Sequence, residues 1–236
     1  EQGQRATCIL SDLAKIVPSS LEIIMNHLEN SFPYWKTPQS GVQLEFFTRN
    51  SLKLGIELPQ LSERIIDFLT RKILLIDSSI RSEDVPYIFN DSDTLNTFSS
   101  AATSSNNVEV VSSVSGFGEK YSKEERAKEV GDAQIAHRIH LEQVRDFASK
   151  VDLMISALLE YIQESSRTER SARDTGLFVL ISFEKNILAG SVKPKFVQFL
   201  IYYAARKNVL VADRFLGSLV AFLFSKDAQL SSHTFS

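Results

Sequence analysis

The chain has 236 residues, of which 43% are hydrophobic and 23% are charged, and its formal net charge at pH 7 is -3. These ordinary values fit one large folded domain or an elongated array, and no excess of positive charge points to nucleic acid or a membrane. We therefore expect no sequence-specific DNA binding and no membrane association. The single cysteine, Cys8, excludes an internal disulfide and fits a reducing compartment. The longest apolar run, 177–188, is too short to span a membrane, and no signal peptide is evident.

The N-terminal region predicts a helical hairpin. Residues 7–17 form a short amphipathic pattern that a proline ends, and Ser19 and Ser20 are small hydroxyl residues that favour the start of a new helix. That helix extends over residues 21–30. The next segment, 31–41, holds two prolines and the only tryptophan, so we expect a loop whose aromatic side chains pack over the end of the hairpin.

The strongest pattern runs over residues 46–80 and predicts two helices joined at Pro59. A proline is accepted in the first turn of a helix, because its missing N–H would have no intrahelical partner there. Arg64, Asp67 and Arg71 fall opposite the apolar stripe of the second helix, so we expect them to face water or a partner. The residues of the stripe, at three- and four-residue steps, are Leu61, Ile65, Phe68, Leu69, Ile73, Ile76 and Ile80.

The composition changes after this second hairpin. Residues 92–115 are chiefly Ser, Thr, Asn and small aliphatic residues without a helical period, and such a stretch cannot offset its ordering entropy. We therefore expect a flexible, disordered Ser/Thr-rich insertion at about 82–118. Residues 119–146 regain helical character with few apolar residues and many mixed charges, which indicates a solvated, partly formed helix leading back into the fold.

Apolar helical patterns resume at residue 147. Residues 147–162 carry a strong stripe, and the run 177–188 is apolar on nearly every side, as is typical of an inner helix covered on two sides. A glycine and a proline separate it from further helices at 195–208 and 209–224. Four hairpins at a spacing of roughly 40 residues predict an all-α fold, an irregular HEAT-like helical-repeat solenoid. We expect one such domain over residues 1–236.

Short motifs occur along this helical pattern in a definite order. They are Phe32-Pro33, Arg49-Asn50-Ser51-Leu52, Pro59-Gln60-Leu61, Lys72-Ile73-Leu74-Leu75-Ile76-Asp77, Val151-Asp152-Leu153-Met154, Phe183-Glu184-Lys185-Asn186-Ile187-Leu188, Phe196-Val197-Gln198-Phe199-Leu200, Tyr202-Tyr203 and Phe215-Leu216. Their order and spacing resemble the RNA polymerase I-specific transcription initiation factors of the TIF-IA type. The chain departs from that family in its insertion, which is Ser/Thr-rich where the family is usually strongly acidic.

This resemblance implies a HEAT-repeat protein of the nucleus and nucleolus that is not an enzyme. It implies binding of RNA polymerase I near its stalk and bridging to promoter-bound core factors at ribosomal RNA genes, under the control of serine phosphorylation. Because family members are longer and this chain begins at Glu1, we expect a fragment of a longer chain. From the fold alone, the alternative is a general HEAT-repeat adaptor or scaffold in transport or complex assembly.

Arg64, Asp67 and Arg71 are the candidate partner-binding residues, because arginine forks pair with carboxylates at two points. The alternative is an ordinary solvated face that serves solubility.

Five hydroxyl residues are candidates for phosphorylation. Ser19 and Ser20 otherwise serve as helix caps, Thr37 precedes a proline in an accessible loop, and Ser104 and Ser105 lie in the insertion. A phosphate adds nearly two negative charges, enough to repel an acidic surface or to disturb a cap. The alternative for the insertion serines is simple linker.

The sequence predicts no catalytic, cofactor or metal site, since it lacks a Gly-rich phosphate loop, a GxSxG motif and an HExxH motif. His137 and His140 would need Asp132 and a further ligand to hold a metal, so solvated histidines are the simpler interpretation. Cys8 is interpreted as a buried thiol rather than a nucleophile. The aromatic cluster Phe196, Phe199, Tyr202 and Tyr203 is interpreted as core at helical spacing rather than as a base-stacking surface.

Overall fold

The regular secondary structure of the described part of the chain is helical. The computed structural model describes residue 17 and residues 19–89, 123–190 and 193–232. Within these ranges the regular structure is helical, and no strand occurs. The all-α prediction is therefore confirmed, while the HEAT-like repeat stays a prediction.

The structure divides into two compact units. The larger unit comprises the described residues up to 79 and from 149 onward, and the smaller unit comprises those within 80–148. The larger unit contains α2 (Ser20–Asn30), η1 (Pro38–Ser40), α3 (Gly41–Glu57), α4 (Pro59–Ser78), α8 (Glu169–Phe183), η2 (Glu184–Leu188), α9 (Phe199–Lys207) and α10 (Val209–Ser232). Helix α5 (Val85–Phe89) belongs to the smaller unit, and α7 (Lys123–Ser165) contributes residues to both.

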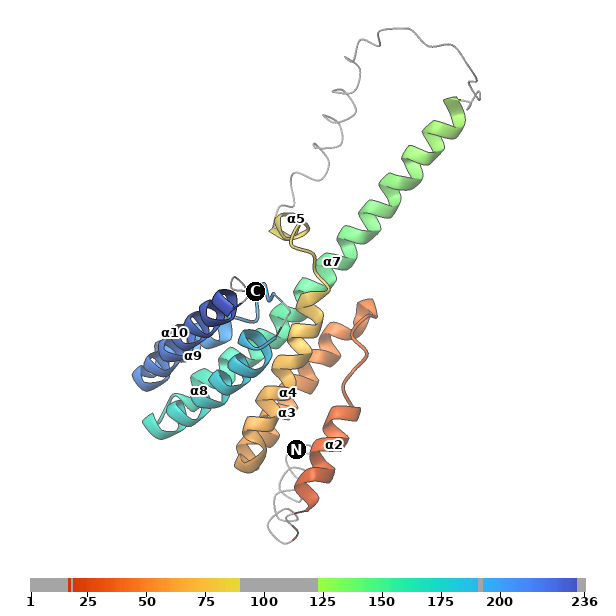
Figure 1. The fold of residues 1–236 in the computed structure, drawn as a ribbon. Helices are drawn as coiled ribbons and strands as arrows, with labels where there is room; N and C mark the ends of the chain where they lie inside the picture. Colours follow the sequence, from red (N-terminus) through yellow and green to blue (C-terminus); the bar gives the residue numbers. More distant parts are fainter. Residues whose placement is uncertain (1–16, 18, 90–122, 191–192, 233–236) are drawn as a thin grey trace. The chain divides into compact units, whose positions relative to one another are not determined.

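The predicted hairpin around Pro59 is confirmed as helices α3 and α4. Pro59 is the first residue of α4, and the Leu58 N–H before it donates to the Leu54 carbonyl at 2.8 Å, which closes α3. All seven residues of the predicted apolar stripe are at most 1% exposed. Burying one such side chain stabilises a fold by roughly 1.5–3 kcal/mol. Helix α4 packs against α2, α3 and α8, so it is central to the larger unit (Figure 1).

Helix α8 is the second central helix, and it packs against α4 as well as against α9 and α10, as the apolar run 177–188 predicted. It begins at Glu169, well before that run. The hydroxyl of Thr168 accepts from the Ser171 N–H at 3.2 Å and caps the helix. The polar stretch 165–174, which separates two apolar patterns in the sequence, is therefore helical from Glu169 onward. A π-helical turn, η2, follows α8 directly.

The loop before α3 packs on the hairpin of α3 and α4, whereas the sequence predicted that it packs on the N-terminal hairpin, whose first helix lies outside the described residues. The Phe32 ring meets the Phe68 ring edge-to-face with centroids 5.9 Å apart, and Trp35 is 8% exposed. The loop is also tied to α7, because Lys150 is buried and its Nζ donates to the carbonyls of Trp35 at 2.9 Å and Thr37 at 2.7 Å. These bonds hold the loop in one conformation.

The charged segment and the stripe that follows it form one helix. Helix α7 is 43 residues long, because the mixed charges before residue 147 do not interrupt the helical backbone. In the smaller unit, Asp84 Oδ2 lies 3.0 Å from His140 Nε2, and α5 follows directly after Asp84. Residues 82–89 of the expected insertion are thus part of a described unit, and the rest of the insertion lies outside the described residues.

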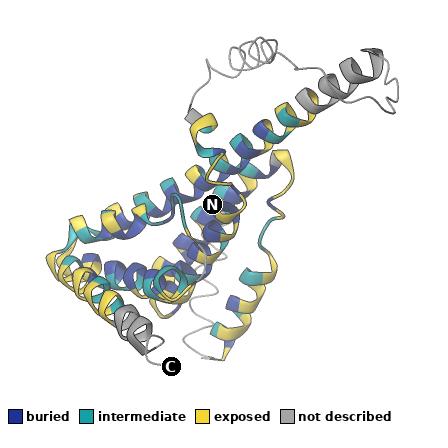
Figure 2. Cartoon of the chain, turned by 45° about the horizontal axis from the view of Figure 1, so that its top comes forward, coloured by how far each residue is buried: buried dark blue, intermediate teal, exposed yellow. Residues whose placement is uncertain are grey.

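Apolar exposure is greatest on the last helix. Over residues 209–224, the helix that leads to the C-terminal marker in Figure 2, α10, shows a largely exposed surface. The predicted stripe there is buried at Phe215, which is 6% exposed, whereas Leu216 is 58% and Leu223 is 62% exposed. The described part of the chain does not cover this face.

Candidate functional site

The predicted partner-binding arginines of α4 face α2. Arg64 makes two hydrogen bonds to Glu22, Nη1 to Oε2 at 2.6 Å and Nη2 to Oε1 at 3.1 Å, and Arg71 Nη2 lies 3.5 Å from Glu29 Oε1. On each helix the paired residues are seven positions apart, which is about two turns, so parallel helices bring both pairs into register. The arginines therefore hold α2 against α4.

These pairs are exposed, and their energetic contribution is small. The hydrogen bond from Arg64 lowers the pKa of Glu22, and the same bond raises the pKa of Arg64. The side chains of Arg64 and Glu22 are 44% and 61% exposed, so water and salt screen the pair. Its geometry fixes orientation more than it stabilises the fold.

Asp67 lies between the two arginines but does not face water. Its side chain is 14% exposed, and it accepts hydrogen bonds from Lys185 Nζ at 3.0 Å and Asn186 Nδ2 at 2.7 Å. Burial disfavours the charged carboxylate, but the bonds from Lys185, Asn186 and the nearby Arg71 outweigh it and lower the pKa of Asp67. The helical period placed Asp67 off the buried stripe but did not show that η2 covers this side of α4. Asp67 joins α4 to η2.

An apolar groove of about 750 Å³ lies between α2 and α3. Ile23 on α2 and Phe46 on α3 line it and are 69% and 68% exposed, although the neighbouring Met25 is 1% exposed. Sequence reasoning missed this groove. The available signal was that α2 carries apolar residues on more than one face, which exceeds what a single contact with α4 buries.

The candidate phosphorylation sites differ in how exposed they are in the structure. Ser19 is exposed at the N-cap position of α2, yet its side chain makes no capping hydrogen bond there, because its own backbone is already helical. Ser20 is 6% exposed, lines the groove, and its hydroxyl has no hydrogen bond with any described residue. The predicted capping role is therefore wrong for both side chains. Thr37 is exposed, and Ser104 and Ser105 lie outside the described residues.

The two histidines have separate partners. His140 pairs with Asp84, and the ring of His137 meets the Tyr87 ring edge-to-face at 6.5 Å. Among the described residues no three His, Cys, Asp or Glu side chains are grouped to hold a metal. Cys8 and the side chain of Asp132 lie outside the described residues.

In the described ranges, none of the helices combines the length and apolarity needed to cross a membrane.

The aromatic cluster of α9 is only partly core. Phe199 and Tyr202 are 53% and 52% exposed, in contrast to the predicted burial. Tyr202 still packs on α10, with its ring 5.8 Å from that of Phe215. Helical spacing placed these rings together but did not show that α10 covers only one side of α9.

Comparison with known proteins gives one positive result. Residues 1–234 match the sequence model of the family described as RNA polymerase I specific transcription initiation factor RRN3. No curated protein and no solved structure matches the chain. The family match covers nearly the whole chain, including both helical units.

Proposed function

Because the chain belongs to the family of RNA polymerase I specific transcription initiation factors, we propose that it binds RNA polymerase I and bridges the enzyme to promoter-bound factors at ribosomal RNA genes. The observation that carries this proposal is the family match over residues 1–234. The proposal includes contact with the stalk region of the polymerase and with core factors, and action in the nucleus and nucleolus. Surface complementarity rather than catalysis performs this role.

The polymerase-binding face centres on α2 and the groove beside it. Exposed apolar side chains such as Ile23 and Phe46, next to a charged surface, have the composition of a protein interface with an apolar core and a polar rim. On the other side of α2, Arg64 and Arg71 set its position through Glu22 and Glu29. In this proposal, the arginines act in docking by holding α2 in place, and Asp67 acts by joining α4 to η2.

Phosphorylation of Ser19 would act directly on this face. The residue is exposed at the start of α2, three positions before Glu22. A phosphate there adds negative charge beside an existing carboxylate and repels an acidic partner surface. Thr37, exposed in the loop before α3, is a second site of the same kind, and Ser20, Ser104 and Ser105 remain proposed sites from the sequence.

Capture of purified RNA polymerase I by the immobilised chain tests the groove. We expect the double substitution of Ile23→Ser and Phe46→Ser to weaken capture at least about tenfold, since central apolar residues dominate interface energies. Both side chains are exposed, so the fold is preserved. The control carries Leu216→Ser and Leu223→Ser, which are similarly exposed on α10. Equal capture by both double variants and the unmodified chain would exclude this face.

A charge swap tests the role of Arg64. Arg64→Glu places two carboxylates together and should weaken capture by displacing α2. Adding Glu22→Arg restores the ion pair with its direction reversed, so capture should recover. If the swapped protein captures as poorly as the single variant, Arg64 contacts the polymerase directly instead of acting through α2.

A further inference from the structure

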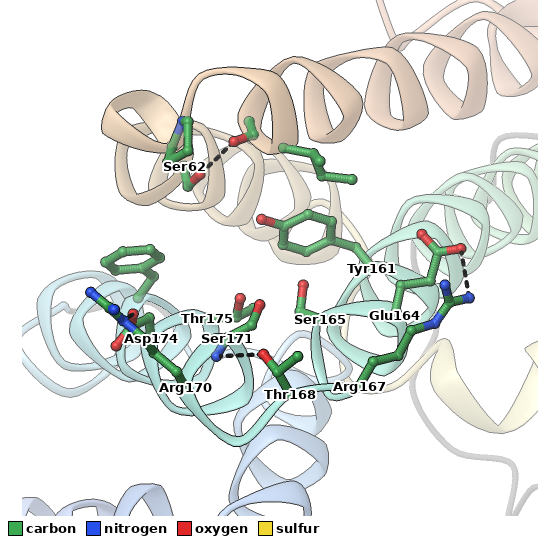
Figure 3. Close-up of a pocket in the computed structure, with 14 residues that line it drawn as sticks. Ser62, Tyr161, Glu164, Ser165, Arg167, Thr168, Arg170, Ser171, Asp174 and Thr175 are labelled. Carbon is green, nitrogen blue, oxygen red and sulfur yellow. Dashed lines mark hydrogen bonds and ion pairs between the residues drawn. The ribbon is translucent and has the colours of Figure 1, made fainter.

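A polar pocket of about 550 Å³ lies in the larger unit, where the connection of α3 to α4 meets the connection of α7 to α8. Figure 3 shows Tyr161 on one side and Ser165, Ser171 and Thr175 on the other, with their hydroxyl groups turned toward the space between them. No element of the proposed polymerase-binding face other than the C-terminal end of α3 contributes to it. It is a separate site.

Two hydroxyl groups at the surface of this pocket belong to largely buried residues and have no protein partner. Tyr161 is 8% exposed and Thr175 is 5% exposed, and the hydroxyl of neither forms a hydrogen bond with a described residue. Ser62 in the same wall differs, since its hydroxyl donates to the Gly55 carbonyl at 2.7 Å. Neither hydroxyl oxygen is among the buried unpaired atoms of the described residues, so both are open to the pocket. Tyr161 and Thr175 are therefore positioned to bind something that enters the pocket.

Two features of the pocket suit an anion, the start of a helix and two arginines that can turn. Helix α8 begins here after Thr168, and a helix N-terminus presents backbone N–H groups and a partial positive charge. At the mouth, Arg167 and Arg170 form long ion pairs with Glu164 and Asp174, at 3.8 and 4.0 Å. These four charges cancel in the present arrangement. Both arginine side chains are at least 80% exposed, so they can turn toward a ligand that carries negative charge.

We propose that this pocket binds a phosphate group, either as free phosphate or as part of a nucleotide. The hydroxyls of Tyr161 and Thr175, the N-terminus of α8 and the two arginines are all hydrogen-bond donors, and a phosphate is a compact group of acceptor oxygens. The proposal does not depend on polymerase binding. If the chain does not bind phosphate, the proposed role of the groove between α2 and α3 in polymerase binding is unaffected.

Isothermal titration of the whole chain with inorganic phosphate, at constant ionic strength set by chloride, tests this proposal. We expect saturable binding that the double substitution of Tyr161→Phe and Thr175→Val weakens at least tenfold. Both changes remove a hydroxyl and keep the shape of the side chain, and circular dichroism verifies the fold. The matched controls are Tyr203→Phe, whose hydroxyl donates to Gln163 outside the pocket, and Thr70→Val, which is 5% exposed within α4. These should bind as the unmodified chain does.

AMP and glucose form the other arms of the titration. Tighter binding of AMP than of phosphate, with the same loss in the double variant, identifies a nucleotide as the source of the phosphate. Equal or weaker binding of AMP identifies free phosphate. Absence of saturable binding of both, equal binding by the double variant, or binding of glucose in place of phosphate would overturn the proposal.

Discussion

Asp67→Asn removes one negative charge from the junction of α4 and η2 without changing the shape of the side chain. Asparagine keeps an oxygen for Asn186 but presents an NH₂ group to Lys185, which is 3.0 Å away, and loses the attraction to Arg71. A charge-assisted hydrogen bond contributes about 1.5–3 kcal/mol when buried. Lys185 and Arg71 are 64% and 47% exposed and regain water, so we expect a net loss of about 1–2 kcal/mol.

The loss should depend on pH with a defined sign. Because the pKa of Asp67 lies below its ordinary value of 3.8, the carboxylate stabilises the folded chain at pH values above 3.8. That contribution disappears as the pH falls through the pKa of the folded state. The difference between the unmodified chain and Asp67→Asn should thus be constant from about pH 7 to about pH 5 and should shrink below 3.8.

Urea unfolding followed by circular dichroism measures this difference in the free energy of unfolding. Thermal unfolding is a second measurement: for a chain of this size, a loss of about 1–2 kcal/mol lowers the thermal midpoint by about 2–8 °C. The control is Asp213→Asn, at an exposed position of α10, which should leave the free energy of unfolding unchanged. A change at Asp67 of less than about 0.3 kcal/mol at pH 7, or a difference that grows on acidification, would refute the reasoning.

Two further substitutions test packing inside the larger unit. Gly176→Ala places a Cβ atom 2.6 Å from Val211 Cγ2, so we expect a loss of about 1–2 kcal/mol by thermal unfolding despite the greater helix propensity of alanine. In a Val211→Ala background the clash is gone and Gly176→Ala should no longer destabilise; a loss of the same size there would contradict the packing argument. Lys150→Met removes the donor from two loop carbonyls and should cost about 2–4 kcal/mol. It should also shift the fluorescence of Trp35, the only tryptophan, to the red, whereas Lys53→Met at an exposed position should not.

The residues predicted for partner binding show how far a sequence pattern reaches. A helical period correctly separated the buried stripe of α4 from Arg64, Asp67 and Arg71. The period assumes, however, that one side of the helix is buried and that the other side is exposed to solvent. Because α4 packs against α2 as well as α8, the same residues pair with Glu22 and Asn186. The pattern identified the polar residues outside the stripe without identifying their partners.

The amino-acid sequence by itself determined the all-α class, the hairpin at Pro59, the apolar stripe of α4 and the family to which the chain belongs. These features are local, since side-chain periodicity and proline geometry act within a few residues. Only the tertiary structure decided which helices cover which faces. Glu22 meets Arg64 across 42 residues and Asp67 meets Asn186 across 119. Contacts between residues so far apart depend on how whole helices pack, and no local pattern encodes them.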